Sequence, residues 1–478
     1  MTSLVIELLS SLTADLALEI DRQGKESLGH QVRRGLLAQI RAGSLRPGVV
    51  LPSTRALAAQ LGISRPLIVD AYAQLAAEGF LIVRHGARPI VASGAARVAP
   101  PLEEKPEQPI RYDLRPAMPD VGLFPRKVWA SAIRTVLNAI PANDLGYGDL
   151  RGSPRLRSAL ADYLGRVRGL VADPSHIFIT SGFTEGRALA CLVLRAVGLR
   201  RVAVEDPGYS DWVAVDKAGL QRVPIPVDEH GIDVDQLIAT GAEGALITPS
   251  HQFPIGGVLS ASRRQRLVRW LAQHDGYVLE DDYDAEFRYD QAPVGALQGL
   301  AADRVIYAGT ASKTLAPALR IGWLVVPPEL VRPMDAELRR WKEGSPRIEQ
   351  DALAHLLQTG AYDRHLRKMR RIYRGRRKHL LDCLAAELPE LEIEGTAAGL
   401  HVTLRLPFEL TRADETQIVS GLRERGLATE GLGRYSQTAE GPRRLFVGYG
   451  RITDSAIASS VRLLAKAVRA AQRHEVGP

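Results

Sequence analysis

A segment rich in proline and charge divides this chain of 478 residues into two parts. Residues Ala99–Pro109 offer almost nothing that a hydrophobic core could bury, which is typical of a semi-extended linker. A chain of this length also exceeds one ordinary core. We therefore expect an N-terminal extension over residues 1–26, a small domain over 27–93, a linker over 94–112 and a large domain over 113–478.

The composition is that of a globular protein, with 45% hydrophobic and 24% charged residues. No apolar run approaches the roughly 20 residues needed to span a bilayer. The apolar opening, Met1–Leu12, lacks the basic segment of a signal peptide. Cys191 and Cys383 lie far apart and lack the spacing of metal ligands. We expect a reduced cytoplasmic protein with no bound metal and no membrane segment.

The positive charge is concentrated near the N-terminus. The whole chain has a formal net charge of +8, and residues 27–97 hold nine arginines against two acids, which gives 9 − 2 = +7. A basic module attached to a nearly neutral remainder favours an anionic partner for that module. A solvated basic face would carry the same charge, so the charge alone leaves both interpretations open.

The small domain shows the pattern of three helices followed by two strands. Apolar residues recur at helical spacing from Leu28 to Ile40. Ser53 and Ser64 stand where N-caps of a second and a third helix belong, and Gly79 stands where the third helix should end. Two short strands over 80–91, joined by a turn, would form a wing. The sequence predicts a winged helix-turn-helix, mainly α with a β wing.

This module resembles the GntR-type winged helix, and the resemblance implies that it binds double-stranded operator DNA. Ser53 and Arg55 would contact backbone phosphates. Ser64 and Arg65 would begin the recognition helix, and Gly86 would lie at the tip of the wing. The resemblance rests on the stretches Leu45–Gly48, Leu51–Arg55, Leu61–Arg65 and Ala71–Phe80.

In the large domain, short apolar runs alternate with helical patterns as far as about residue 328. This alternation predicts an α/β fold with a mainly parallel sheet covered by helices, over about 145–328. The remainder, about 329–478, begins with basic helices and then shows strand-like segments, so we expect a smaller α+β part. The clearest strand candidates are Ile177–Thr180, Arg201–Val204, Ala245–Thr248, Tyr277–Glu280, Val305–Ala308, Leu400–Leu406 and Arg444–Gly448.

Three motifs follow these strands and carry candidate chemistry. Thr180–Gly186 lies between a strand and a helix, so its amides could bind an anion, although such turns are often glycine-rich for packing alone. Glu280–Asp284 closes another strand, and an acidic cluster of this kind could also bind Mg²⁺. Lys313 lies among small hydroxyl residues in Gly309–Trp323, where it could equally be a surface lysine.

Taken in order, these motifs resemble the fold-type-I aminotransferases, which bind pyridoxal 5′-phosphate (PLP). The resemblance implies that Lys313 forms the Schiff base, while Tyr209 stacks on the ring. Asp281 would pair with the pyridine nitrogen and Tyr283 with the phenolic oxygen. The residues expected around the phosphate are Gly182, Phe183, Thr184, Thr310, Ser312 and Arg320.

Two further segments fit the same resemblance. Tyr147 matches the tyrosine that reaches the phosphate of a neighbouring subunit, which implies a homodimer. Arg434 matches the arginine that binds the substrate carboxylate, so we expect it to bind an effector. Phe253 stands where aminotransferases usually carry an asparagine, so an amide contact to the phenolic oxygen is expected to be lost.

The stretch His251–Pro254 and the order of the two domains resemble the MocR-type regulators over about residues 27–450. This resemblance implies a PLP-dependent, sequence-specific DNA-binding regulator whose aminotransferase-like domain senses an amino compound or PLP. The alternative is a genuine aminotransferase with an accessory helix-turn-helix. Lys313 and Asp281 are both present, so an aminotransferase-type half-reaction stays open.

Overall fold

The computed structural model describes residues 16, 18–84, 86–93, 109–289, 294–341, 346–407, 410–438 and 443–474. Contacts divide the chain into two compact units, Met1–Pro106 and Glu107–Pro478, and each is described by itself. Most of the predicted N-terminal extension and residues 94–108 of the predicted linker lie outside the described residues. No helix in the described ranges is long and apolar enough to cross a membrane.

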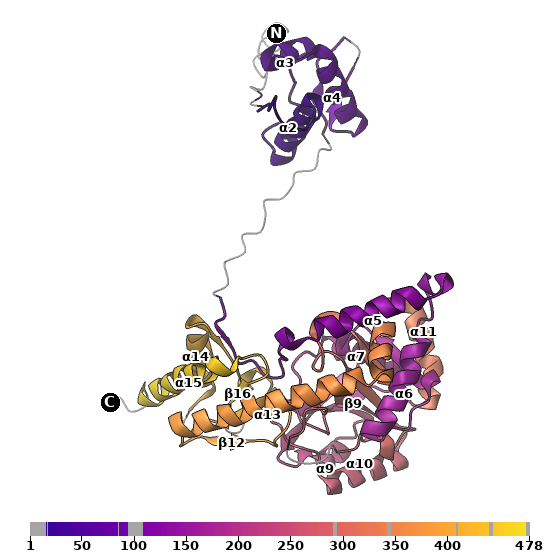
Figure 1. The fold of residues 1–478 in the computed structure, drawn as a ribbon, viewed down its shortest axis with the longest axis vertical. Coiled ribbons are helices and arrows are strands. Elements are labelled where there is room, and N and C mark those ends of the chain that lie inside the picture. Colours follow the sequence, from indigo (N-terminus) through magenta and orange to yellow (C-terminus); the bar gives the residue numbers. More distant parts are fainter. Residues whose placement is uncertain are drawn as a thin grey trace. The chain divides into compact units, whose positions relative to one another are not determined.

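The N-terminal unit consists of three helices and a two-stranded wing, as the sequence predicts (Figure 1). Its core is formed by one apolar face from each helix, including Leu36, Leu57 and Ile68. The two strands pair antiparallel, and an isolated bridge joins Val50 to Ile90 beside them. The elements are α2 (Leu28–Ala42), α3 (Thr54–Leu61), α4 (Arg65–Ala77), β1 (Leu81–Ile82) and β2 (Ile90–Val91).

Local capping explains where these helices begin and end. The Ser53 hydroxyl accepts a hydrogen bond from the Ala56 N–H at the start of α3. Ser64 occupies the N-cap of α4 but makes no side-chain cap bond. Gly62 between α3 and α4 has φ 62°, and Gly79 after α4 has φ 80°. Both are left-handed conformations that favour glycine, so the sharp turn of the motif is encoded locally.

The second unit is built on an eight-stranded, mainly parallel sheet. β11 runs antiparallel to both of its neighbours, and β7 runs antiparallel to β6; the other pairs are parallel. In spatial order the strands are β4 (Ile177–Thr180), β11 (Gly322–Val325), β10 (Val305–Thr310), β9 (Tyr277–Asp282), β8 (Gly244–Ile247), β5 (Arg201–Asp206), β6 (Gln221–Asp228) and β7 (Gly231–Ile232).

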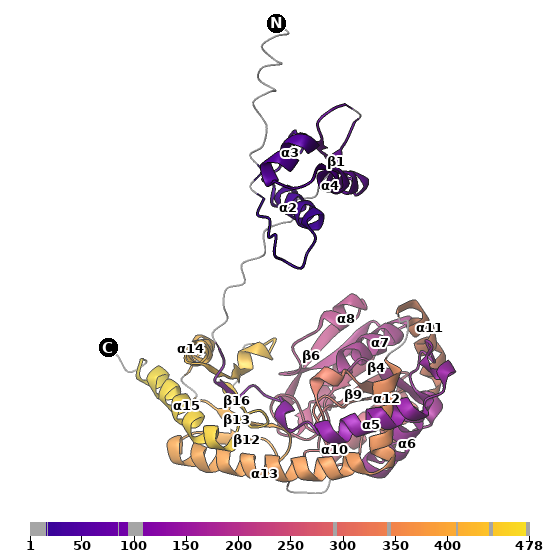
Figure 2. The same ribbon diagram turned by 45° about the horizontal axis from the view of Figure 1, so that its top comes forward.

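Helices cover both faces of this sheet (Figures 1 and 2). The side chains of successive strand residues point to opposite faces of the sheet, as those of Val278 and Leu279 do in β9. One face packs against α7 (Phe183–Ala196), α8 (Val213–Lys217) and α11 (Val331–Trp341). The other packs against α5 (Arg126–Ala139), α6 (Pro154–Arg168), α9 (Val234–Ala239), α10 (Ala261–Gln273) and α12 (Arg347–Gln358).

A smaller sheet and its helices complete the unit. The long helix α13 (Ala361–Glu387) joins the two cores, because Leu366 packs with the large sheet and Leu380 with the small one. A two-stranded pair, β3 (Tyr112–Asp113) with β14 (Leu427–Ala428), ties the start of the unit to this part. The small sheet contains β12 (Glu392–Glu394), β13 (His401–Arg405), β16 (Arg444–Gly448) and β15 (Glu430–Gly431), with α14 (Arg412–Glu424) and α15 (Asp454–His474) beside it.

Short 3₁₀ turns link several of these elements. They are η1 (Val121–Leu123), η2 (Ala142–Leu145), η3 (Pro174–His176), η4 (Gln298–Leu300), η5 (Pro317–Leu319), η6 (Pro328–Leu330) and η7 (Leu432–Arg434). The predicted candidates Gly182, Tyr209, Asp281 and Lys313 lie at or just beyond the carboxyl ends of β4, β5, β9 and β10. Ligands of open α/β sheets bind at this edge, so the topology gathers these residues.

Candidate functional site

The N-terminal unit presents its candidate DNA contacts at the beginnings of α3 and α4. Arg55 is exposed in the first turn of α3, and Ser64 and Arg65 are exposed where α4 begins. The Arg65 Nε donates a long hydrogen bond of 3.4 Å to the Thr54 hydroxyl, which brings the two helix starts together. Exposed arginines beside helix N-termini are suited to phosphate oxygens.

Gly86 lies in the turn of the wing. It is exposed, has φ 77°, and an added Cβ would have no heavy atom within 4 Å. The positive φ explains why glycine is placed there, and the open surroundings leave the tip accessible.

In the second unit, Arg320 faces the start of α7, and we call this arrangement the cradle. Gly182 precedes α7 with φ 91°, and an added Cβ would lie 3.3–3.4 Å from the Arg320 guanidinium carbon and nitrogens. Phe183 and Thr184 open the helix, where backbone N–H groups have no partner within the helix. A planar cation facing a helix N-terminus is suited to a phosphate dianion.

Hydroxyl groups and a strained backbone complete the cradle. The Thr310 hydroxyl donates to the Ser312 hydroxyl at 2.9 Å and lies 3.3 Å from the Ile321 carbonyl. Arg320 itself has φ 51°, a left-handed conformation that is uncommon outside glycine and that concentrates at functional sites. Arg320 also borders a cavity of about 390 Å³ with Thr180 and Ser181.

Lys313 and Asp281 form the reactive part of the site. Burial lowers the pKa of the Lys313 amine, and the nearby carboxylates of Asp284 and Asp281 oppose that shift. A lowered pKa makes the unprotonated, nucleophilic amine more available. Burial raises the pKa of Asp281 well above its usual value, against the opposing charges of Arg187 and Lys313.

One atom of Asp281 tests whether these residues fit PLP. Its Oδ1 is buried and has no hydrogen-bond partner among the described residues. Such an acceptor is costly unless a ligand donor meets it. A pyridine N–H would supply that donor, while the cradle of Gly182 and Arg320 would accept the phosphate. The residues present therefore fit the cofactor.

Tyr209 is surrounded on its ring by Phe183 and Arg187. Phe183 meets it edge-on, with ring centroids 6.1 Å apart and an interplanar angle of 81°. The Arg187 guanidinium carbon lies 4.4 Å from its ring centroid. Burial raises the pKa of the Tyr209 hydroxyl, so the neutral ring remains available for stacking.

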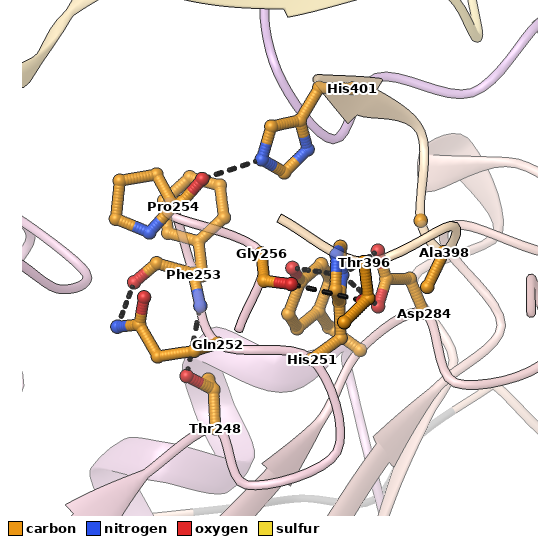
Figure 3. Close-up of polar contacts among 12 residues, drawn as sticks. Thr248, His251, Gln252, Phe253, Pro254, Gly256, Asp284, Thr396, Ala398 and His401 are labelled. Carbon is orange, nitrogen blue, oxygen red and sulfur yellow. Dashed lines mark hydrogen bonds and ion pairs between the residues drawn. The ribbon is translucent and has the colours of Figure 1, made fainter. Parts of the chain in front are cut away.

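Tyr283 belongs to a buried polar network. Its hydroxyl lies 3.0 Å from His251 Nδ1. The same Nδ1 also lies 3.0 Å from both carboxylate oxygens of Asp284 (Figure 3). The sequence predicts that the Tyr283 hydroxyl contacts the phenolic oxygen of PLP, and this contact stays a prediction. In the structure the same hydroxyl has a protein partner, His251. His251 and Asp284 were not among the sequence candidates, although His251 opens the stretch that carries the MocR resemblance.

A second network holds the loop that presents Phe253. The Phe253 N–H donates to the Thr248 hydroxyl at 3.0 Å (Figure 3). That hydroxyl in turn donates to Glu205 at 2.5 Å. Gln252 Nε2 donates to the Pro207 carbonyl at 2.9 Å. Burial raises the pKa of Glu205 to about 7. These contacts hold the phenyl ring of Phe253. At this position the sequence predicts that an amide contact to the phenolic oxygen of PLP is lost.

A buried ion pair beneath the site was also missed by sequence reasoning. Arg168 Nε donates to Asp282 Oδ2 at 2.8 Å, and the Tyr307 hydroxyl donates to the same oxygen at 2.6 Å. The two side chains of the pair are 3% and 2% exposed. Asp282 lies next to Asp281 in the motif, but its partner is 114 residues away, and nothing local signals it.

The two remaining candidates are both exposed. Tyr147 is 89% exposed, so its hydroxyl is free to meet another molecule. The Arg434 side chain is 64% exposed and forms an ion pair with Glu430 at 3.5 Å. The adjacent Tyr435 packs edge-on against Phe253, with ring centroids 5.1 Å apart, which places the segment of Arg434 beside that ring.

Two family models match separate parts of the chain. The model described as "Bacterial regulatory proteins, gntR family" matches residues 28–91. The model described as "Aminotransferase class I and II" matches residues 120–453.

Curated relatives match nearly the whole chain. The HTH-type pyridoxine biosynthesis transcriptional regulator PdxR of Corynebacterium glutamicum is 34% identical over 447 residues, covering 92% of this chain and 95% of the relative. The probable rhizopine catabolism regulatory protein MocR of Rhizobium meliloti is 32% identical, covering 84% and 85%. The HTH-type transcriptional regulator TauR of Rhodobacter capsulatus is 30% identical, covering 93% and 97%.

Solved aminotransferases share the fold of the second unit. Kynurenine aminotransferase of Pyrococcus horikoshii has a TM-score of 0.69 at 24% identity, covering 78% of this chain and 92% of that one. LysN, the α-aminoadipate aminotransferase of Thermus thermophilus, has a TM-score of 0.67 at 25% identity, covering 76% and 93%. The LysN structure contains N-(5′-phosphopyridoxyl)-L-leucine, an adduct of the cofactor with an amino acid.

Proposed function

Because this chain belongs to the MocR-type transcription regulators, in which a gntR-type DNA-binding unit precedes an aminotransferase-like unit, we propose that its second unit is a sensor. The signal would be an amino compound or PLP itself, and the response would be a change in binding to a specific operator. DNA binding and PLP binding follow from the family; the sensing role and the residues that perform it are our proposal.

The observation that carries this proposal is that one chain combines a gntR-type unit with candidate cofactor residues gathered at one edge of the large sheet. Exposed Arg55 and Arg65 stand at the starts of two helices. In the second unit, Arg320 and the start of α7 would bind the phosphate, Asp281 would hold the pyridine end, and Lys313 would present its amine to the cofactor. When bound, PLP supplies an aldehyde that condenses reversibly with amines. Lys313 and an incoming amine would therefore compete for the aldehyde carbon of PLP.

Footprinting on the DNA upstream of the protein's own gene tests this function. We expect protection of a defined sequence, and we expect the pattern or affinity to change when PLP is added. Lys313→Ala should still bind that DNA but should lose the response to an amine. A protein that protects no sequence in preference to random DNA would contradict the proposal.

A second function has one observation in its favour. Lys313 and Asp281 are both in place, and these are the groups that an aminotransferase uses. Steady turnover of an amino acid with a keto acid by the PLP-loaded protein would identify an enzyme. A single slow conversion without turnover would fit the sensor.

We also propose that the protein acts as a homodimer. The exposed ring of Tyr147 supports this assignment, because a tyrosine with 89% exposure is available to reach a neighbouring subunit's phosphate. Tyr147→Phe should weaken PLP binding without changing the mass measured by sedimentation. A wild-type protein that binds PLP fully as a monomer would refute the assignment.

A further inference from the structure

Arg187, in the second turn of α7, carries a buried positive charge to which the proposed function gives no role. Its side chain is only 3% exposed, and its Nη2 donates to Asp211 at 3.2 Å. Its Nε and Nη1 atoms are buried and have no hydrogen-bond partner among the described residues. Buried donors without acceptors are unfavourable, so these two point to a partner that joins them when the site is loaded.

A matching acceptor belongs to Asp281, which lines the same cavity as Arg187. Arg187, Tyr209 and Asp281 all line a space of about 30 Å³, room for roughly one water molecule. Asp281 Oδ1 is itself buried without a partner among the described residues. The residues that carry the unpaired guanidinium donors and the unpaired carboxylate oxygen thus line the same small cavity.

The other charges near Asp281 are already engaged. Asp282 is held by Arg168 at 2.8 Å, and Asp284 is held by His251 at 3.0 Å. Lys313 is the second cation that acts on Asp281, and it no longer offers a free ammonium group once its amine is joined to the cofactor. The hydroxyl of Tyr209 carries no charge. Of the two cations that act on Asp281, Arg187 is therefore the one that keeps a free charged side chain when PLP is bound.

Resting on the proposed function, in which Asp281 faces the pyridine nitrogen, we infer that Arg187 shares the Asp281 carboxylate with that nitrogen and weakens its hold on a proton. A carboxylate paired with a guanidinium is a weaker base, and a second positive charge beside the ring repels a proton there. Charge near the ring nitrogen sets how strongly the cofactor withdraws electrons. Arg187 thus favours reversible capture of an amine over its conversion, as a sensor requires.

The test uses full-length protein loaded with PLP that carries ¹⁵N in its ring, with the nitrogen resonance followed against pH. In Arg187→Gln the ring nitrogen should bind its proton about tenfold more tightly than in the wild type. Arg187→Lys keeps the charge and should resemble the wild type. Asp211→Asn keeps Arg187 but removes its partner, so its ring nitrogen should lose the proton at a lower pH than in the wild type.

Arg222→Gln is the matched control, because Arg222 also lies over an aromatic ring, that of Trp212 at 5.9 Å, and also pairs with an aspartate. It should titrate like the wild type. Identical titrations of the wild type, Arg187→Gln and Asp211→Asn would overturn the inference, as would an Arg187→Lys protein that titrates like Arg187→Gln. If Arg187→Gln fails to bind PLP, the inference is judged by Asp211→Asn alone: a ring nitrogen that titrates as in the wild type would overturn it. Failure of the wild type to bind PLP would instead refute the proposed function.

Discussion

The Lys313 amine provides the most direct test of the site at the scale of single residues. Lys313→Ala should abolish the covalent adduct that borohydride traps in the wild-type protein, because no other lysine is expected to reach the aldehyde. The measurement is the mass of the reduced protein. Lys217→Ala, which changes an exposed lysine on α8, should retain the adduct. An adduct of equal stoichiometry in Lys313→Ala would mean that another lysine reacts.

Glu205 should make the stability of the second unit depend on pH. Its pKa is raised by burial to about 7, above the value in the unfolded chain. The protonated carboxyl therefore stabilises the fold fully at low pH, and this contribution is lost as pH rises from about 4.5 to about 7. At about 1.4 kcal/mol per pKa unit, the loss is on the order of 3 kcal/mol.

The measurement is urea unfolding at pH 5 and pH 7.5. Glu205→Gln cannot ionise, so its stability should fall less between the two pH values than that of the wild type. Glu424→Gln, at an exposed position on α14, should behave like the wild type. An equal fall in Glu205→Gln would show that Glu205 is ionised in the folded protein at both pH values.

At the scale of elements, two glycines at opposite ends of α7 separate backbone strain from ligand contact. Gly182 has φ 91° and faces Arg320, whereas Gly198 has φ 112° and an added Cβ there meets no atom within 4 Å. Gly182→Ala and Gly198→Ala should both lower stability, by about 1 kcal/mol or more. Only Gly182→Ala should also weaken PLP binding, because its methyl group enters the phosphate cradle. Equal PLP affinities in a titration would show that the cradle does not bind phosphate.

The starts of α3 and α4 should differ in what they contact on DNA. If Arg55 binds a backbone phosphate, Arg55→Ala should weaken binding to all sequences and reduce the salt slope by about one unit. If Arg65 reaches a base, Arg65→Ala should lose about 1–3 kcal/mol at one position of the operator. Fluorescence titrations on operator and random DNA at several salt concentrations measure both effects. Arg166→Ala, at an exposed position on α6, is the control; indistinguishable effects of the first two changes would remove the distinction.

At the scale of the whole molecule, the two units must be coupled for the protein to act as a sensor. If PLP changes operator affinity, then operator DNA must change PLP affinity by the same factor, because binding free energies are linked. A useful switch needs about 1–3 kcal/mol, or roughly 5–150-fold. Titrating PLP with and without operator, and operator with and without PLP, measures both factors. Identical PLP affinities in a protein that still binds operator would show that PLP is not the signal.

The sequence by itself determined the elements that depend on local chemistry, and it predicted the reactive residues. The Ser53 cap, the left-handed Gly79, the period of each helix and the apolar strands are set by neighbours within a few residues, and the structure confirms them. The motif around Lys313 is also continuous in the chain. Parallel strands then bring their carboxyl ends to one edge, so the gathering of Gly182, Asp281 and Lys313 followed from topology.

Only the tertiary structure decided which distant side chains become partners. Arg168 with Asp282, His251 with Asp284 and Arg187 with Asp211 each join segments that carry no mutual signal in the sequence. The short antiparallel strand β11 was likewise absent from the sequence-based strand predictions, and its first two residues belong to the lysine motif Gly309–Trp323. These features have one physical reason in common. The partner of a buried charge depends on packing and distance, and both are fixed only when the separate elements come together in the fold.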